Sequence, residues 1–230
     1  MSLQDPVPAD RPQVVVFDVN ETLSDLSALG ARFLEVGASA SAARLWFASV
    51  LRDGFALNVA GESPVFAGVA RENLRVALSE ASLDRTLDEA ADHVMDGFAR
   101  LEVHADVPAG VDRMHEAGLR LVTLSNGSAG VAERLLEDAN LLDRFERLLS
   151  VEDAGAWKPS ARAYEHAAEA CGTSPAEMLL VAVHPWDVDG ALRAGFQAAW
   201  VNRSDGPWPG TFREPTYTVD GLEELAEVLA

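Results

Sequence analysis

Four short apolar runs and a weaker fifth recur along the chain, and they alternate with segments whose apolar residues have helical spacing. Runs of this length are typical of strands buried on both faces of a parallel sheet. We predict strands at residues 14–17, 119–124, 179–183 and 198–201 with a weaker one at 148–151, and helices at 107–117, 129–139, 161–171 and 188–194. Strands that alternate with helices indicate an α/β fold, with a doubly wound parallel sheet covered on both faces.

Residues 26–104 interrupt this alternation, because they are rich in Ala and Leu, carry periodic apolar positions such as Leu45 and Leu74, and contain no convincing strand. We therefore expect a helical cap domain at 26–104, inserted after the first strand into a core domain made of residues 1–25 and 105–230. Such helices would cover the carboxyl end of the first strand and exclude water from it. The alternative is that they only enlarge the core.

The composition indicates an ordinary globular protein with a strong acidic balance. The chain has 230 residues, of which 48% are hydrophobic, so it can bury a sizeable core. Its 37 acidic and 18 basic residues give a formal net charge of −19, which repels phosphate backbones and anionic membrane surfaces. We therefore expect neither a nucleic acid nor a membrane as a partner. A site for a small anionic substrate would need local donors and at least one cation.

Cys171 is the only cysteine, which excludes an intramolecular disulfide and is typical of a reducing compartment. Residues 1–12 are polar and rich in proline without an apolar stretch, and no later apolar run approaches the roughly 20 residues of a membrane helix. We expect a soluble, cytoplasmic protein with a short flexible leader. The sequence leaves open whether the chain works as a monomer or as a homodimer.

Asp18 directly follows the first apolar run, within the segment FDVNETL at residues 17–23. A carboxylate just past a buried strand lies in the crevice where open α/β sheets bind their ligands. There it can serve as a covalent nucleophile. The alternative is a simple turn, with Asp18 and Asn20 as turn formers and Thr22 as a helix cap.

Polar residues also follow the second predicted strand, in the segment SNGS at residues 125–128. The hydroxyl of Ser125, the amide of Asn126 and free backbone N–H groups lead there into a helix, an arrangement suited to binding a carboxylate or a phosphate. The alternative is a plain N-cap at Ser128.

Two further motifs bring a cation and two carboxylates to later strand ends. Lys158 stands beside the stiff Pro159, and taken alone it is more typical of a solvated surface lysine. His184, Asp187 and Asp189 follow the strand predicted at 179–183 and stand ahead of a helix, where the two carboxylates could act only as caps.

The order of these motifs resembles the haloacid dehalogenase superfamily, whose hydrolases use an aspartate nucleophile. The order is Asp and Thr after the first strand, Ser-Asn after the second, then Lys-Pro, and finally Asp before Gly-Ala. The resemblance extends from residue 14 to about residue 202 and includes a helical cap between the first two motifs. It implies a Rossmann-like core domain under that cap.

The resemblance also implies roles for individual residues. Asp18 is the nucleophile, while Thr22 and Ser125 hydrogen-bond the reacting groups. Lys158 holds the negative charge of Asp18 and of the intermediate, which lowers the cost of an ionised carboxylate away from water. Asp187 in turn orients Lys158.

Two positions favour one branch of the superfamily. The phosphatase branch carries a second acid two residues after the nucleophile, where this chain has Asn20, and an amide cannot transfer a proton at neutral pH. The metal-binding aspartate of that branch would fall at about Ala182 or Val183, and neither side chain offers the oxygen that Mg²⁺ needs. Both positions indicate the L-2-haloacid dehalogenase branch, which uses no cofactor because halide leaves unprotonated.

In that branch the aspartate displaces halide from C2 of a 2-haloalkanoate with inversion, and water then cleaves the aspartyl ester. The resemblance implies that Ser125, Asn126 and nearby N–H groups hold the substrate carboxylate. The residues expected to contact the small anionic substrate are Asn20, Trp46, Phe47, Asn126, Tyr164 and Trp186.

This chain also departs from the branch. An arginine that directly follows a tryptophan on a cap helix captures the departing halide in the branch, whereas here Trp46 is followed by Phe47. Arg44 and Arg52 lie nearby on the same predicted helix. Asn20 stands where the branch commonly has a tyrosine.

His184 stands where the branch tends to have an asparagine, three residues before Asp187. Because the ordinary pKa of histidine lies near neutral pH, His184 could activate the water that cleaves the ester. The alternative is a neutral histidine that is hydrogen-bonded within a loop.

The sequence therefore predicts a hydrolase that removes halide from a small 2-haloalkanoic acid. One alternative is a Mg²⁺-dependent phosphatase of the same superfamily, with Asp187 or Asp189 recruiting the metal from an unusual position. Another is a binding protein that kept the fold and lost efficient catalysis, in which case Asn20 and Phe47 would be the substitutions that accompanied this loss.

Overall fold

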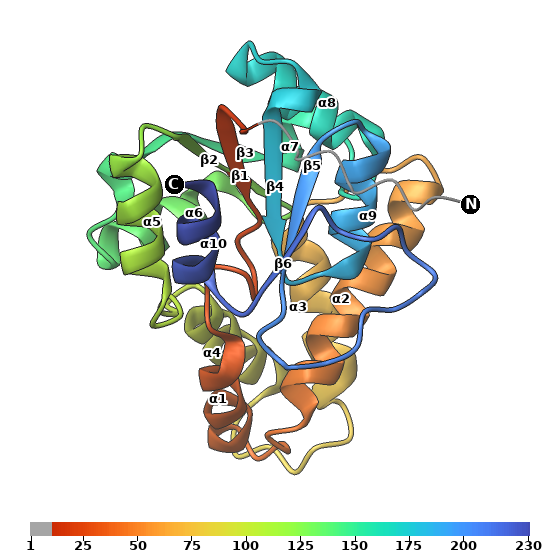
Figure 1. Cartoon of the computed structure of the whole chain (residues 1–230). Helices are drawn as coiled ribbons and strands as arrows, with labels where there is room; N and C mark the ends of the chain where they lie inside the picture. The colour runs from red at the N-terminus through yellow and green to blue at the C-terminus, as the bar shows by residue number, and fades with distance from the viewer. Residues whose placement is uncertain (1–10) are drawn as a thin grey trace.

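The computed structural model describes residues 11–230, so most of the predicted leader lies outside the described residues. One sheet of six parallel strands runs through the centre, in the order β3-β2-β1-β4-β5-β6 (Figure 1). The strands are β1 (Val14–Phe17), β2 (Arg120–Ser125), β3 (Phe145–Ser150), β4 (Met178–Ala182), β5 (Gln197–Val201) and β6 (Tyr217–Val219).

Helices connect the strands and cover the sheet. The α-helices of the described chain are α1 (Leu29–Glu35), α2 (Ala42–Val59), α3 (Phe66–Leu78), α4 (Leu87–Phe98), α5 (Val107–Glu116), α6 (Ala129–Asp138), α7 (Val151–Ala154), α8 (Ala161–Cys171), α9 (Pro185–Arg193) and α10 (Leu222–Leu229). Short 3-10 helices lie at Leu26–Ala28, Leu142–Arg144 and Pro175–Glu177. Among residues 11–230, none of the helices is both long and apolar enough to cross a membrane.

The two faces of β1 bury different helices, because side chains alternate along a strand. Val15 and Phe17 belong to a cluster with residues of α5, α6 and α10, on one side of the sheet in Figure 1. Val14 and Val16 belong to a cluster with residues of α8 and α9, on the other side. The prediction of an α/β fold with a doubly wound parallel sheet is therefore confirmed.

The edges of the sheet differ from the sequence prediction. The residues from Phe145 to Arg147, at the start of β3, are half-buried or exposed, so this edge strand shows no continuous apolar run, and Val151 begins α7 instead of ending the strand. The strand β6 has only three residues and was not predicted, since it is too short for a pattern to develop.

The start of α9 corrects the predicted boundary. The helix begins at Pro185, three residues earlier than expected, and proline is favoured in the first turn because its missing N–H would be unpaired there anyway. Asp187 and Asp189 consequently lie inside α9 and do not precede it.

Between β1 and α5 the chain forms only helices and loops apart from isolated bridges, and α1 to α4 lie at the carboxyl end of the strands (Figure 1). Their buried residues are continuous with one face of the sheet. The contact with the core is close, because a Cβ on Gly54 of α2 would lie only 2.1 Å from the ring of Trp157. The division into a cap domain and a core domain stays a prediction.

Candidate active site

The strand order brings the predicted site segments after β1 and β4 to one place. The strands β1 and β4 are neighbours, although most of the chain separates them, and the order of the sheet reverses direction there. In open α/β sheets the crevice at such a switch point binds ligands. The residues that follow β1 and β4, Asp18 and His184, meet at this crevice, and Asp18 extends the ladder by donating its N–H to Val181 O at 3.0 Å.

The Asp18 carboxylate is almost fully buried, with 4% of the residue exposed, and it accepts three hydrogen bonds. Lys158 Nζ lies 2.9 Å from Oδ1, while Thr22 Oγ1 and His184 Nδ1 lie 2.7 Å and 3.1 Å from Oδ2. Burial by itself would raise the pKa of Asp18, but Lys158 and His184 outweigh burial and lower the pKa well below its usual range. The carboxylate is therefore ionised at neutral pH.

Lys158 is the only lysine of the chain and has no exposed surface, so the alternative of a solvated surface lysine is wrong. Its Nζ bridges Asp18 and Asp187 Oδ2, the latter at 2.7 Å. Burial lowers the pKa of Lys158, and the two carboxylates raise it by more. Asn126 positions the backbone of this residue, because its Oδ1 accepts the Lys158 N–H at 3.0 Å.

Asp187 is held from both sides. Its Oδ1 accepts the Tyr164 hydroxyl at 2.6 Å, while Oδ2 accepts Lys158. Burial raises the pKa of Asp187, and burial together with Asp187 raises the pKa of Tyr164 well above its usual value. Gly190 makes this approach possible, because a Cβ there would lie 2.5 Å from the Tyr164 hydroxyl oxygen. Tyr164 thus contacts Asp187, away from the nucleophile.

Thr22 is part of the cluster and does not cap a helix. Its hydroxyl donates to Asp18 and accepts the Val183 N–H at 3.1 Å, so it ties the loop after β1 to the end of β4. Ser125 is buried nearby, and its Oγ accepts the Gly127 N–H at 2.9 Å. Ser128 occupies the N-cap position of α6 without a side-chain hydrogen bond to the helix.

His184 lies between two carboxylates. Its Nε2 donates to Glu21 Oε2 at 2.8 Å, opposite the Nδ1 bond to Asp18. Burial would lower the pKa of His184, but the bonds to Asp18 and Glu21 raise it to about 9, so the ring is an imidazolium at neutral pH. Glu21 was not among the predicted site residues, although it stands within the FDVNETL segment.

The predicted aromatic contacts divide into two groups. Phe47 stacks on His184 with ring centroids 6.5 Å apart, and Trp186 lies 5.0 Å from the same ring. Trp46 lies in the interior of the helical region, where its indole N–H donates to Ala70 O at 2.9 Å. Asn20 is buried and lines a separate small cavity. The structure brings Phe47 and Trp186 to the cluster, and Trp46 only behind Phe47.

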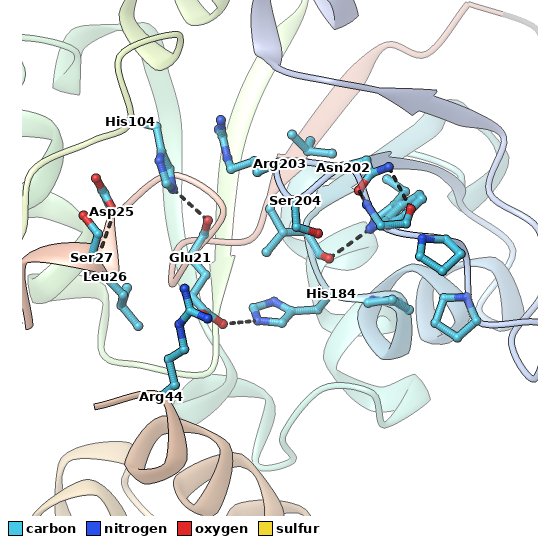
Figure 2. Close-up of a pocket in the computed structure, with 17 residues that line it drawn as sticks. Glu21, Asp25, Leu26, Ser27, Arg44, His104, His184, Asn202, Arg203 and Ser204 are labelled. Carbon is cyan, nitrogen blue, oxygen red and sulfur yellow. Dashed lines mark hydrogen bonds and ion pairs between the residues drawn. The ribbon is translucent and has the colours of Figure 1, made fainter. Parts of the chain in front are cut away.

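A cavity of about 520 Å³ opens beside His184 (Figure 2). Residues of the core and of α2 line it, including Glu21, Arg44, His104, His184, Trp200 and Arg203. Asp18 does not line this cavity, so His184 and Glu21 separate the nucleophile from it. The Arg44 side chain extends from α2 toward Glu21 and His184 (Figure 2), whereas Arg52 pairs with Asp53 on the surface.

The described residues offer no donor set for Mg²⁺. Among residues 11–230 no three His, Cys, Asp or Glu side chains gather in a way that could hold a metal ion. Asp187 is bonded to Lys158 and Tyr164, and Asp189 accepts Arg193 Nε at 2.6 Å and a backbone N–H. The carboxylates that the phosphatase alternative requires therefore do not fit a magnesium site.

Dehalogenases are among the solved structures that share this fold. The crystal structure of a dehalogenase with an intermediate complex is 28% identical, with a TM-score of 0.89 over 96% of this chain and 98% of that chain. The L-2-haloacid dehalogenase from Xanthobacter autotrophicus is 25% identical, with a TM-score of 0.85 over 95% of this chain and 98% of that chain.

The chain belongs to the haloacid dehalogenase-like hydrolase family, whose model matches residues 12–195. Among curated relatives, an (S)-2-haloacid dehalogenase of Pseudomonas putida is 30% identical over 94% of this chain and 96% of its own length. Haloacetate dehalogenase H-2 of Moraxella sp. (strain B) is 28% identical over 95% of this chain and 98% of its own length. The resemblance inferred from the sequence is confirmed.

Proposed function

We propose that this protein hydrolyses the carbon–halogen bond of a small 2-haloalkanoic acid through an ester on Asp18. The observation that carries the proposal is the buried carboxylate of Asp18, which Lys158 keeps ionised, with an amide at position 20 and no donor set for Mg²⁺ among residues 11–230. The relatives named as 2-haloacid and haloacetate dehalogenases support it. We also propose that residues 26–104 act as a cap over this site.

The hydrogen bonds on Asp18 indicate which oxygen attacks. Oδ2 accepts two donors, from Thr22 and His184, whereas Oδ1 accepts only Lys158. Oδ1 therefore keeps a lone pair for C2 of the substrate. The new bond joins Oδ1 to C2 while the carbon–halogen bond breaks, and the halide takes the electron pair without a proton. Because the halide leaves without a proton, this step needs no acid at position 20, where the chain has the amide of Asn20.

In the second step water adds to Cγ of Asp18, the proposed ester carbon. Oδ2 is then the carbonyl oxygen, and Thr22 already donates to it, so the negative charge of the tetrahedral intermediate develops where a donor stands. Collapse regenerates the Asp18 carboxylate and gives a 2-hydroxy acid. One proton is released in each turnover, because the products are the alcohol, halide and a hydrogen ion.

The anionic substrate needs donors and a cation. Ser125 Oγ accepts a hydrogen bond from the Gly127 N–H, and among the described residues its own proton has no acceptor, so the hydroxyl can donate to a substrate carboxylate. We assign Phe47 and Trp186 to the apolar wall near C2. Arg44 is the cation of α2 that reaches the cavity, and we assign to it the attraction of the anionic substrate.

A panel of haloacids and phosphate esters, each assayed with and without EDTA, tests the proposal, with Asp18→Asn as the blank. We expect halide release from (S)-2-chloropropionate or chloroacetate that EDTA leaves unchanged. In H₂¹⁸O, a single turnover should place ¹⁸O in the Asp18 carboxylate, because water attacks Cγ. Turnover of a phosphate ester alone, abolished by EDTA, would overturn the proposal in favour of the phosphatase alternative.

A further inference from the structure

His184 is bracketed by two carboxylates that come from the same loop. Asp18 and Glu21 stand three residues apart after β1, and their side chains bind the two ring nitrogens of His184 at 3.1 Å and 2.8 Å. The ring is held in plane by its neighbours, since Phe47 and Trp186 lie against it. A histidine fixed in this way has one nitrogen on the nucleophile and the other on a separate acid.

The backbone around Glu21 fixes the direction of its side chain. Glu21 has φ of 63°, the left-handed region that few residues other than glycine adopt, and such strain is kept where the surroundings impose it. His104 Nε2 donates to the Glu21 carbonyl oxygen at 3.0 Å, on the wall of the cavity in Figure 2. The Glu21 side chain is 40% exposed, whereas that of His184 is only 11% exposed. Glu21 therefore links the buried imidazole to the solvent in the cavity.

We propose that Glu21 is a positioning residue that fixes the proton of His184 on Nε2, so that Nδ1 accepts the proton of the water that cleaves the Asp18 ester. This inference rests on the proposed function and deepens it. Glu21 thereby has a positioning role, and His184 acts as a base only after the ester has formed.

Ester formation changes the charge that faces His184. Before the reaction Asp18 carries a negative charge and accepts the Nδ1 proton. Afterwards Asp18 is a neutral ester whose Oδ2 is a carbonyl oxygen, so the attraction that keeps Nδ1 protonated weakens, and that proton passes from Nδ1 to a water that enters the site while Glu21 keeps the proton on Nε2. Neutral Nδ1 and carbonyl Oδ2 are then two acceptors facing each other at about 3 Å, which is repulsive. A water that donates to Nδ1 relieves this repulsion and lies beside Cγ.

The protons balance over one turnover. His184 begins as an imidazolium and gives one proton to solvent after halide has left. The attacking water gives one proton to Nδ1 and its hydroxyl to Cγ, and collapse of the intermediate breaks the Cγ–Oδ1 bond to the product. The proton of the new carboxylic acid then passes to the product oxygen. Asp18 is again a carboxylate, His184 is again an imidazolium, and one proton has been released.

Titratable and charged groups from the neighbouring elements surround His184. These are Asp18 and Glu21 after β1, Arg44 on α2, His104 before α5, Lys158 before α8, Asp187 on α9, and Arg203 after β5. In the proposed reaction only Asp18 among them changes its charge during turnover. The change in basicity of His184 therefore follows the state of the nucleophile.

Rapid-quench kinetics with (S)-2-chloropropionate test the base. Halide release and the mass of the Asp18 peptide are followed together in wild type, His184→Gln and Glu21→Gln. We expect the ester to form and accumulate in both variants, with its hydrolysis slowed about 10²–10⁴-fold in His184→Gln and about tenfold in Glu21→Gln. The exposed Glu62 and His115 provide matched controls, Glu62→Gln and His115→Gln, which should hydrolyse the ester at the wild-type rate.

The pH profile of ester hydrolysis distinguishes a positioning role of Glu21 from a purely structural one. Hydrolysis of the ester should rise with pH as His184 loses its proton, and loss of the Glu21 charge should move the midpoint about one pH unit lower in Glu21→Gln. A purely structural role would lower the rate without moving the midpoint. An unchanged midpoint, or wild-type ester hydrolysis in His184→Gln, would overturn the proposal.

An NMR titration of the imidazole requires no turnover. Asp18→Asn makes the nucleophile position neutral, as the ester does, and ¹⁵N signals of His184 are assigned by their loss in Asp18→Asn/His184→Gln. We expect the pKa of His184 to fall relative to wild type, and the neutral ring to carry its proton on Nε2. A neutral ring protonated on Nδ1 contradicts the proposal. If wild type releases no halide and forms no ester, the proposed function fails separately, and this titration still decides the role of Glu21.

Discussion

Two buried regions meet at His184, and they are built in opposite ways. The charged cluster consists of Asp18, Lys158, Tyr164, His184 and Asp187 together with the hydroxyl of Thr22, and the aromatic layer consists of Trp46, Phe47, Phe66, Phe98 and Trp157. Each contact in the charged cluster is a directed hydrogen bond of 2.6–3.1 Å with a named donor and acceptor. Ring centroids in the aromatic layer lie 5.6–6.4 Å apart at angles from 20° to 86°.

The difference lies in what a substitution removes. A buried charge that loses its partner keeps its full desolvation cost, so a change in the charged cluster has an abrupt effect. An apolar contact is lost in proportion to the volume removed, and the neighbours relax partly, so a change in the aromatic layer has a graded effect. The charged cluster should therefore respond to substitution in an all-or-none way, and the aromatic layer should not.

Asp18→Asn is expected to have the largest effect. The amide keeps the shape of the side chain but is a poor nucleophile, so turnover of a haloacid should fall on the order of 10⁵-fold or more. The fold should persist, because Lys158 keeps Asp187 as a partner. Halide release and circular dichroism measure the two effects. Activity close to wild type in a correctly folded Asp18→Asn variant is incompatible with Asp18 as the nucleophile.

Lys158→Met should have the next largest effect, because it leaves Asp18 and Asp187 buried together without a cation. We expect a loss of about 3–5 kcal/mol in the free energy of unfolding, together with loss of activity, since the pKa of Asp18 rises without Lys158. Urea denaturation measures the first effect. Arg52→Met, which removes the surface pair with Asp53, is the control and should change stability by less than about 1 kcal/mol. A loss of unfolding free energy as small as that of the control would show that Lys158 does not stabilise the charged cluster.

The single lysine offers a direct probe of the same contact. A ¹⁵Nζ-lysine label reports Lys158 as the only lysine side chain. In Asp18→Asn the pKa of Lys158 should fall below its wild-type value, because one of the two carboxylates that raise it is gone. A Lys158 titration that is the same in both proteins would place the ammonium away from Asp18.

Phe47 tests whether the aromatic layer responds in a graded way. Phe47→Leu should destabilise the protein by about 1 kcal/mol and Phe47→Ala by about 3 kcal/mol, with ester hydrolysis falling less than tenfold in the leucine variant. Phe98→Leu is the matched control, because Phe98 packs in the same layer but is not in ring contact with His184. It should lower stability to a similar extent and leave ester hydrolysis unchanged. An abrupt loss of activity in Phe47→Leu would place Phe47 with the charged cluster.

The same difference explains what the sequence could predict. Asp18, Lys158 and Asp187 were predicted as a group because the order of their motifs along the chain resembles that of the superfamily, whereas Lys158 or Asp187 alone carried no such signal. Trp46 was predicted to contact the substrate, but aromatic spacing on a helix does not show which ring faces the site, and its indole binds Ala70 O. In the aromatic layer the side-chain volume determines the packing, and several residue types can fill a similar volume, so the sequence does not fix which ring faces the site.

Glu21 could not have been predicted in its role, because the left-handed backbone that turns it toward His184 has no signal in a non-glycine residue. The core strands were predicted because buried parallel strands read as continuous apolar runs. By contrast, α10 was missed, although Leu222, Leu225 and Leu229 have helical spacing that could have revealed it.

The pH dependence of stability tests where the two regions meet. The pKa of His184 is raised from 6.5 to about 9 in the folded protein, so the native state binds more protons than the unfolded state between these values. The contribution of His184 is therefore fully present below pH 6.5 and is lost as pH rises through 9, with a slope of at most about 1.4 kcal/mol per pH unit. Asp18 has a lowered pKa, and its contribution to stability is lost only in acid, so it does not change in this range.

Urea denaturation from pH 6.5 to 9 should give a falling free energy of unfolding for wild type and a flatter curve for His184→Gln. Equal slopes in the two proteins would mean that the folded state does not hold His184 protonated, and that His184 does not belong to the charged cluster.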